Sequence, residues 1–405
     1  MPTPQVEPRR LAFWPLMNAV CRHFPACGGC DFQDKTYAEQ LAYKQTFCTN
    51  LFARFSCPES LPIIPSEAIQ YYRNRMDFSA QEKNGSLALG LRQKNRPAQV
   101  IDARECLIFS EQTAEILDVF RAWAPEAGFK GYDVYRHDGE FRYVSIRQAR
   151  ASGAIMVTAV FAFDSDVFNR HKEKFQELAA RLTKIAAVRS VYVCLNEKVS
   201  DDALSDRLFL LGGEEYLREN INGVEYLVGP QVFLQPNPAA AAKMYALIAE
   251  AARKSGGDVL DLYCGSGGIA LQVAGSAQRV TGVDNLAANI ELARKNAALN
   301  SAHNVEFVCA DVEKYLLENR AGRFSLVIVD PPRAGLSKKT RQAIIESRVP
   351  NLVYVSCNPM NLREDLKVLA PAYSLSKIVP FDMFPHTRHF EVVAELSWQK
   401  PGGKE

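Results

Sequence analysis

One cysteine near the C-terminus is placed where it could act as a nucleophile. Cys357 follows the apolar run 351–356 and precedes Asn358 and Pro359. This pattern predicts a strand that ends in a turn and holds one thiol at the edge of a sheet. A free cysteine more often packs as a small apolar side chain. Other polar or reactive groups also follow predicted strands, and this context favours catalysis.

A glycine-rich loop upstream of this cysteine is typical of a nucleotide cofactor site. Gly265 and Gly267 follow the apolar run 259–263 and come just before a predicted helix. Asp284 ends the next predicted strand, where a carboxylate can bind ribose hydroxyls, although it could also cap the helix that follows. A dinucleotide enzyme would share these features, but its third, later glycine is missing from this sequence. The loop therefore favours S-adenosylmethionine.

A thiol and a methyl donor together indicate methylation of a pyrimidine carbon. Uracil C5 is a weak nucleophile until a thiolate adds at C6, and a base must later remove the C5 proton. Cys357 is the candidate thiol and Glu391 the candidate base. Asp330, before two prolines at another strand end, could orient the cofactor or the uracil edge. The alternatives are a solvated strand end for Glu391 and a turn cap for Asp330.

A second group of cysteines indicates a metal centre. Cys21, Cys27 and Cys30 form a Cys-x5-Cys-Gly-Gly-Cys motif, whose glycines permit the positive φ angles that let thiolates converge. Cys106 is the best candidate for a fourth ligand. We expect an iron–sulfur cluster, while zinc, for which two tight Cys-x2-Cys pairs are more typical, and unliganded thiols remain alternatives. Four ligands would close the cluster, making it structural or regulatory.

Composition is that of an ordinary protein of two or three domains. The chain has 405 residues, 47% of them hydrophobic, and a net charge of +2, so nucleic-acid contacts would need a local basic face. Ten cysteines are too sparse for a disulfide scaffold and indicate a reducing, cytoplasmic setting. No segment reaches the roughly 18 apolar residues of a membrane helix. Residues 9–21 resemble a twin-arginine signal superficially, but the short, interrupted apolar run favours an edge strand.

The pattern of apolar residues predicts two regions. Residues 1–230 form a strand-rich α+β region, with one long helix at 37–55 that could pack on the catalytic domain and strands near 72–78 and 141–147. Residues 231–405 alternate between helix and strand, which indicates an α/β fold with a parallel, doubly covered sheet. The expected helices are 239–252, 268–275 and 287–300, and the expected strands are 258–263, 280–284, 305–309, 326–330, 351–356, 375–379 and a last, antiparallel strand at 392–396. This is the pattern of a class I Rossmann-like methyltransferase domain.

The chain resembles the RNA uracil-C5 methyltransferases of bacteria and archaea, which make 5-methyluridine, over nearly its whole length. The matching segments are the cysteine motif with Cys106 and residues 72–74, 233–237, 261–265, 330–333, 356–359 and 382–387. The resemblance implies that Cys357 is the nucleophile, that Glu391 is the base, and that the four cysteines hold a [4Fe–4S] cluster. It also implies that the S-adenosylmethionine site is lined by Gln235, Tyr263, Asp284 and Asp330.

Departures from the family pattern bear on the substrate. Only 20 residues precede Cys21, so the N-terminal RNA-binding β-barrel of some relatives is not expected. Asp284 stands where glutamate is commoner, and Gly268 where some relatives have asparagine. The cysteine motif favours 23S rRNA, because bacterial tRNA enzymes of the family generally lack it, while archaeal tRNA enzymes keep the T-loop uridine of tRNA as an alternative. A DNA or RNA amino-methyltransferase and an iron–sulfur RNA-binding protein without activity are further alternatives, and we expect a monomer.

Thiol attack requires the uridine to leave its stack, so single-stranded or loop RNA is the expected substrate. Basic and aromatic residues of the strand-rich region could bind phosphates and stack on bases, although a solvated strand face is the alternative. These residues are Tyr71, Tyr72, Arg73, Arg75, Phe78, Arg92, Lys94 and Arg96.

Overall fold

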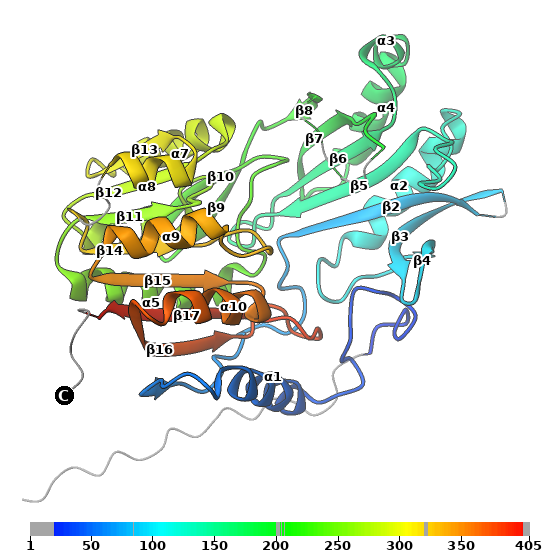
Figure 1. The fold of residues 1–405 in the computed structure, drawn as a ribbon. Helices are drawn as coiled ribbons and strands as arrows, with labels where there is room; N and C mark the ends of the chain where they lie inside the picture. The colour runs from blue at the N-terminus through cyan, green and yellow to red at the C-terminus, as the bar shows by residue number, and fades with distance from the viewer. Residues whose placement is uncertain are drawn as a thin grey trace, which may run out of the picture.

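The protein is described by a computed structural model at residues 20–83, 85–199, 203, 205, 207–319 and 323–399. Two large sheets stand next to each other, one from the middle of the chain and one from its C-terminal half (Figure 1). The edge strand predicted within residues 9–21 lies almost wholly outside the described residues. No helix in the described ranges is long and apolar enough to cross a bilayer.

The C-terminal half builds a sheet of eight described strands. Their order is β1 (Glu59–Ser60), β16 (Tyr373–Phe381), β17 (Glu391–Trp398), β15 (Asn351–Ser356), β14 (Leu326–Val329), β11 (Val259–Leu262), β12 (Val280–Asp284) and β13 (Val305–Cys309). Strands β11 to β15 pair in parallel, whereas β17 is antiparallel to both neighbours, as the sequence predicts for the last strand. The carboxyl ends of β11, β12, β14 and β15 therefore meet at one edge.

Helices cover both faces of this sheet, because its strands are apolar on both sides. One apolar core joins the sheet to α5 (Pro238–Ser255), α6 (Gly268–Val273) and α7 (Ala287–Leu299). A second core joins the opposite face to α8 (Val312–Glu318), α9 (Lys338–Ser347) and α10 (Pro359–Leu369). The last three helices were not among the elements expected from the sequence.

The described residues in the middle of the chain form a seven-stranded sheet. Its order is β4 (Arg96–Asp102), β3 (Ser86–Gln93), β2 (Arg75–Lys83), β5 (Phe141–Gln148), β6 (Ile155–Phe161), β7 (Val188–Leu195) and β8 (Arg207–Gly213). All pairs are antiparallel except β6 with β7, which α3 (Ser165–Arg170) and α4 (Lys172–Leu182) connect. With α2 (Thr113–Glu126), α4 covers one face around the buried Trp123.

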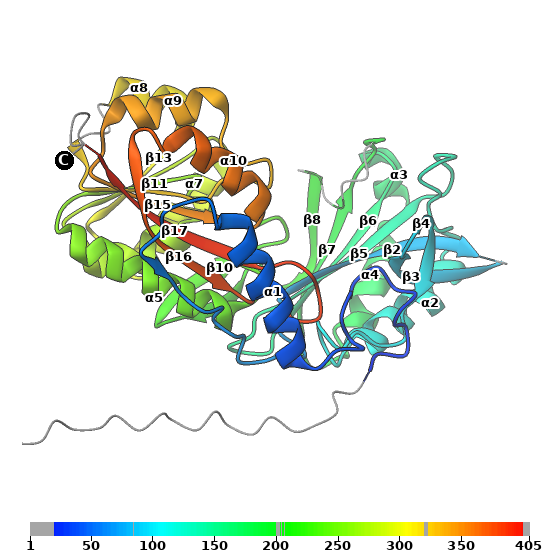
Figure 2. The ribbon, with the colours of Figure 1, turned by 60° about the horizontal axis from the view of Figure 1, so that its bottom comes forward.

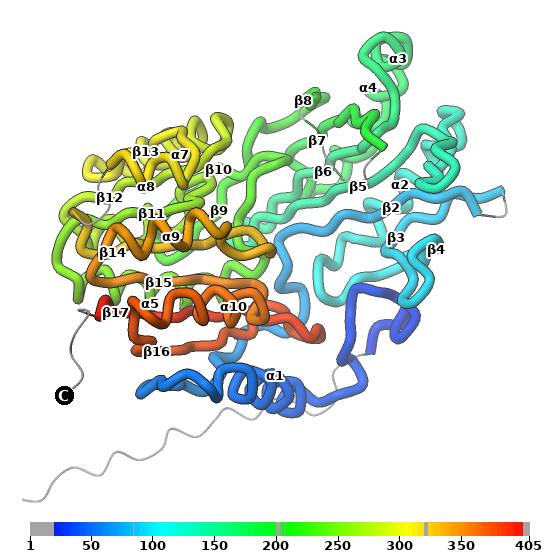
Figure 3. Tube along the Cα trace, in the orientation of Figure 1, coloured from blue at the N-terminus to red at the C-terminus, as the bar shows by residue number. Residues whose placement is uncertain are grey.

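Two small elements tie the sheets together. The hairpin β9 (Leu217–Ile221) and β10 (Val224–Val228) shares an apolar core with α5 and with residues of β6 and β7. Residues 20–36 pass beside β3 and β4, where Gly28 N donates to the Arg92 carbonyl, and then lead into α1 (Figure 3). The N-terminal part of the chain therefore contacts both sheets.

Helix α1 (Tyr37–Phe52) packs on the C-terminal sheet rather than on the sheet that follows it in sequence (Figure 2). Thr36 and Glu39 form a capping box at its start. The helix ends at Phe52, three residues before the predicted end at residue 55, and β1 then pairs with β16. The strand predicted at residue 72 starts at Arg75, because Tyr71 takes a left-handed conformation with a φ of 51°.

Candidate functional site

Cys357 and Glu391 lie opposite each other at the end of two antiparallel strands. Ser356, the last residue of β15, pairs with Val392 of β17, so the next position along the ladder sets Cys357 against Glu391. Both line a cleft of about 950 Å³ between the two sheets. The same cleft is lined by Gln235 and Arg333, so four polar groups from separate segments converge there.

Burial raises the pKa of both groups of this pair. Burial, and then the nearby carboxyls of Glu391 and Asp330, raise the pKa of Cys357 to about 12, while Arg333 opposes the shift. Burial also raises the pKa of Glu391 well above its usual value, with Asp330 adding to the effect. Among the described residues, Glu391 Oε2 has no hydrogen-bond partner. The environment of the cleft thus favours the neutral forms of this thiol and this carboxyl group.

Asp330 follows β14 at the same sheet edge and contacts Gln235. Gln235 Nε2 donates to Asp330 Oδ2 over 3.2 Å, and burial raises the pKa of Asp330 to about 7 despite this hydrogen bond. The position of Gln235 is fixed by Asn74, whose side-chain Nδ2 donates to the Gln235 carbonyl over 2.8 Å. The link between the β2 segment and the C-terminal sheet therefore orients a side chain of the site.

The glycine-rich loop connects β11 to α6 through three left-handed residues: Tyr263 at 63°, Gly265 at 54° and Gly267 at 88°. A Cβ on Gly267 would lie 2.8 Å from the Phe307 ring, so a side chain there would collide. Asp284, at the end of β12, accepts a hydrogen bond from Gly265 N over 3.1 Å. Asp284 therefore fixes the loop, and its other oxygen accepts from the backbone at the start of α7.

A second, smaller cavity of about 30 Å³ lies against this loop. Three of the four predicted cofactor residues, Gln235, Tyr263 and Asp330, line it, and Gln235 lines the large cleft as well. Asp284 does not line the cavity itself but holds Gly265, which does. The two hollows are thus neighbours that share the lining residues Phe233, Leu234 and Gln235.

Two residues that the sequence interpretation left without a role lie in these hollows. Asp261 lines the smaller cavity, and burial raises its pKa well above the usual value. A carboxylate inside an apolar strand is a signal that could have identified it. Arg333 lines the large cleft. Its positive charge lowers the pKa of both Cys357 and Glu391.

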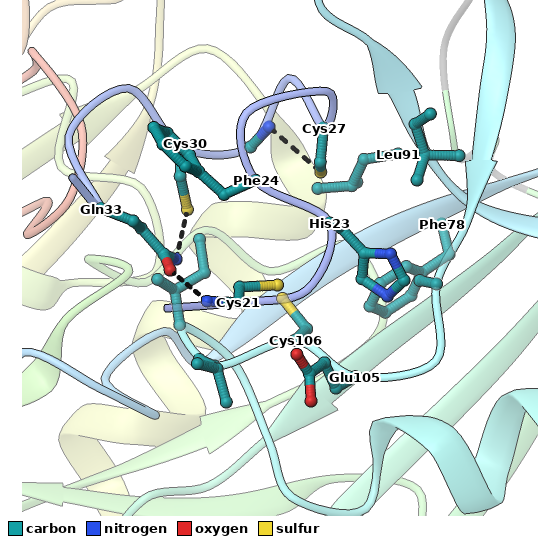
Figure 4. Close-up of a pocket in the computed structure, with 15 residues that line it drawn as sticks. Cys21, His23, Phe24, Cys27, Cys30, Gln33, Phe78, Leu91, Glu105 and Cys106 are labelled. Atoms are coloured by element: carbon teal, nitrogen blue, oxygen red, sulfur yellow. Dashed lines mark hydrogen bonds between the residues drawn. The ribbon is translucent and has the colours of Figure 1, made fainter. Parts of the chain in front are cut away.

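The four predicted ligand cysteines, Cys21, Cys27, Cys30 and Cys106, line one cavity of about 30 Å³ (Figure 4). Gln33 Nε2 donates to Cys30 Sγ over 3.2 Å, and Gly29 N donates to Cys27 Sγ over 3.5 Å. Burial raises the pKa of Cys30 to about 12. In the described part of the chain, no group of three or more potential ligands has the arrangement of a metal site.

The predicted basic and aromatic surface is only partly present. Tyr72 is buried, with its hydroxyl donating to the Pro385 carbonyl over 2.9 Å, and Phe78 is buried in the core, so neither can stack on a base. Alternation along β2 places Phe78 on the inner face, whereas Tyr72 lies just before the strand. Lys94 pairs with Asp31 over 2.9 Å. Of the five other predicted residues, Arg73, Arg75 and Arg92 line the cleft, while Tyr71 and Arg96 do not. Two arginines that were not predicted, Arg147 and Arg333, line it as well.

The sheet order, the loop after its first strand and the polar groups along its carboxyl edge define an α/β protein of the methyltransferase class. Residues 36–398 match the model of the tRNA (uracil-5-)-methyltransferase family. The chain therefore belongs to this family and is an RNA (uracil-C5)-methyltransferase.

Relatives extend over most of the chain. It is 34% identical over 386 residues to an uncharacterized RNA methyltransferase of Clostridium tetani, an alignment that covers 94% of this chain and 84% of the relative. It is 34% identical to an uncharacterized RNA methyltransferase of Porphyromonas gingivalis, covering 93% and 86% of the two chains. The crystal structure of Pyrococcus abyssi tRNA (uracil-54, C5)-methyltransferase in complex with S-adenosyl-L-homocysteine superposes with a TM-score of 0.74 at 29% identity, covering 92% and 86%.

Proposed function

We propose that this enzyme methylates C5 of a specific uridine in RNA, with Cys357 as the nucleophile and Glu391 as the base. The observation that carries the proposal is that these two residues, one position beyond the Ser356 and Val392 pair of β15 and β17, line one cleft. A thiol and a carboxyl group that face each other at this position can reach two neighbouring atoms of one ring. C6 and C5 of uracil are such atoms.

In the proposed reaction, the Cys357 thiolate adds to uracil C6, and the electron pair of the C5–C6 double bond moves toward C5 and O4. The carbanionic C5 then accepts a methyl group. Glu391, as a carboxylate, removes the C5 proton, and the electrons of that C–H bond restore the double bond and expel the thiolate. Arg333 lowers the pKa of both Cys357 and Glu391, and so favours the charged forms that the reaction needs.

We propose that Gln235, Tyr263, Asp284 and Asp330 form the S-adenosylmethionine site. Bound there, the cofactor would supply an electrophilic methyl group. The fit is supported by the small cavity at the glycine-rich loop and by Gln235 Oε1, a buried acceptor without a partner among the described residues. The Pyrococcus enzyme, crystallised in complex with S-adenosyl-L-homocysteine, supports the same cofactor class.

The proposed substrate is 23S rRNA, which the cysteine motif favours through the family resemblance. The tRNA T-loop uridine is the second candidate, and the Pyrococcus tRNA (uracil-54, C5) enzyme favours it. Membership of a uracil-5 family favours carbon over amino-group methylation. We further propose a monomer in the cytoplasm, with residues 1–230 serving cluster and RNA binding and residues 231–405 serving catalysis.

We propose that Cys21, Cys27, Cys30 and Cys106 hold a [4Fe–4S] cluster with a structural or regulatory role. Four thiols on one cavity supply the ligand type and number, and the N–H···S contacts from Gln33 and Gly29 are of the kind that tune such clusters. Zinc would accept the same four thiolates, so metal and acid-labile sulfide analysis of the purified protein separates the two.

Mass mapping of 5-methyluridine tests the proposed function. Ribosomal and transfer RNA from a strain lacking the gene should lose the modification at one position, and the wild-type gene should restore it. A gene encoding Cys357→Ala should not restore it, whereas Cys309→Ala, altered at an exposed cysteine, should. Full retention of 5-methyluridine in both RNA classes would contradict the proposal.

A further inference from the structure

Arg147 is a buried cation without a counter-ion in the wall of the large cleft. It lies on β5, is only 3% exposed, and lines the cleft together with Cys357 and Glu391. Its Nε donates to the Pro230 carbonyl over 3.0 Å. Its Nη2 has no hydrogen-bond partner among the described residues. A buried guanidinium donor that lacks a partner is costly for the fold, so it calls for an explanation outside stability.

The neighbours of Arg147 increase this cost. Arg75 stands directly opposite it in the register of β2 and β5. The nearby Asp77 is engaged elsewhere, since it accepts from Arg75 Nε over 3.1 Å and from Ser145 Oγ over 2.5 Å. Burial, and then the charge of Arg75, lower the pKa of Arg147 to about 9, so the side chain still carries its charge at neutral pH.

Arg142, a second buried arginine on β5, serves a structural role. Arg142 is 2% exposed, and its Nη1 donates to the Asn196 carbonyl over 2.8 Å and to the Lys198 carbonyl over 2.6 Å. Arg142 thus joins β5 to the segment after β7 through two backbone carbonyls, whereas Arg147 reaches a single carbonyl and lines the cleft. The two arginines are therefore a natural pair for comparison.

The cleft as a whole is positive. Its described lining contains five arginines and three carboxyl groups. Among the carboxyl groups, Asp31 is already paired with Arg388 and Lys94, and Glu391 is buried with a raised pKa. An anion entering the cleft would find excess positive charge beside the reactive pair.

We propose that Arg147 binds a backbone phosphate of the RNA strand next to the target uridine. This inference rests on the proposed function and adds a binding site to it. A phosphate oxygen in the cleft would accept a charge-assisted hydrogen bond from the guanidinium that lines its wall. Such a contact holds the strand in register while the base enters the site and carries no sequence information itself. The carboxylate of the cofactor is the other candidate anion, but Arg147 does not line the cavity at the glycine-rich loop.

The test uses full-length Arg147→Gln and Arg147→Met. Arg189→Gln is the matched control, because Arg189 is exposed on β7 of the same sheet and does not line the cleft. A labelled oligouridylate serves as the probe, and its affinity is measured by fluorescence anisotropy over a series of salt concentrations. S-adenosylhomocysteine affinity without RNA and the unfolding midpoint in urea are measured for each protein.

We expect both Arg147 variants to bind the oligouridylate about tenfold more weakly, as loss of one charge-assisted contact predicts. The slope of log affinity against log salt should fall by about 0.7, the value for one phosphate on a single strand. Their affinity for S-adenosylhomocysteine should be unchanged, and the urea midpoint equal to or above that of the wild type. Arg142→Met should instead lower the midpoint.

Unchanged RNA affinity and salt slope in the Arg147 variants, while the wild type binds, would overturn the inference and leave the proposed function intact. Weaker S-adenosylhomocysteine binding with unchanged RNA binding would assign the site to the cofactor instead. A lower urea midpoint for Arg147→Met, as for Arg142→Met, would make the role structural. If the wild-type protein itself binds no RNA, the proposed function fails.

Discussion

Lys44 and Asp382 form an ion pair in which neither side chain is exposed, with Lys44 Nζ 2.5 Å from Asp382 Oδ1. The same Nζ donates to the Phe384 carbonyl over 3.0 Å. Lys44 belongs to α1 and Asp382 follows β16, so the pair joins the first described helix to the segment that leads into Glu391. Helix α1 is thus fixed to the segment that precedes Glu391.

Removing one partner of this pair should destabilise the protein strongly. Lys44→Met leaves the Asp382 carboxylate buried and unpaired, which costs about 3–5 kcal/mol. Urea unfolding measures the loss. Lys254→Met, which removes an exposed pair with Glu250 on α5, should change stability by less than about 0.5 kcal/mol. Equal effects of the two variants would contradict a structural role for the buried pair.

The buried carboxyl of Asp330 should make stability depend on pH. Its pKa is about 7 in the folded protein and about 4 in an unfolded chain, so the folded form binds the additional proton between these values. Stability therefore falls as pH rises from about 4 to about 7. Asp330→Asn avoids this loss, and its stability relative to the wild type should rise by about 4 kcal/mol over the range.

Urea unfolding at a series of pH values checks this expectation. Asp311→Asn is the control, because Asp311 is an exposed N-cap of α8 and asparagine caps helices equally well. A stability difference between Asp330→Asn and the wild type that is flat across pH would show that Asp330 is already ionised in the folded protein.

Loss of one cavity cysteine should release the proposed cluster. Cys106→Ser is expected to lower both iron and acid-labile sulfide to background in anaerobically purified protein, since a thiolate ligand is replaced by a poor one. Cys57→Ser, altered outside the cavity, should keep both. Stoichiometric zinc without acid-labile sulfide in the wild-type protein would contradict the proposed cluster and indicate a structural zinc site instead.

Blocking the proposed base should stop the reaction after methyl transfer. Glu391→Gln cannot accept the C5 proton, so the RNA should remain bonded to Cys357 and carry the new methyl group. Gel electrophoresis under denaturing conditions, with a methyl-labelled cofactor, would show label on the protein band. If Glu391→Gln instead turns over at the wild-type rate, another group removes the proton.

Much of the C-terminal sheet could be predicted because its strands are continuous apolar runs. The bounds of β12, β13 and β15 agree with the sequence prediction. Helix α9 was missed because its sequence is largely polar and its apolar face is small. The candidate pair Cys357 and Glu391 was predicted from the positions of both residues near strand termini, from the thiol and base that uracil methylation requires, and from the family resemblance; its catalytic role stays a prediction.

Long-range pairing is what the sequence could not reveal. Lys44 is a residue type that normally lies on an exposed helix face, yet it is buried and paired with Asp382, which is 338 residues away. Arg147 lies on a strand that is buried on both faces, so the alternation that normally separates core from solvent gives no information there. Phe78 was misassigned to the surface because alternation groups residues by face without saying which face meets the core. Tyr72 was misassigned because its contact with the Pro385 carbonyl is also long-range.

The central claim is that Cys357 bonds to a uridine ring during the reaction. RNA containing 5-fluorouridine at the modified position should give a covalent complex with the wild-type enzyme and S-adenosylmethionine, because fluorine at C5 leaves no proton for Glu391 to remove. Mass spectrometry of the digested complex should place the methylated nucleotide on the peptide containing Cys357. A folded, cofactor-binding enzyme that methylates natural RNA but leaves this peptide unmodified would contradict the account.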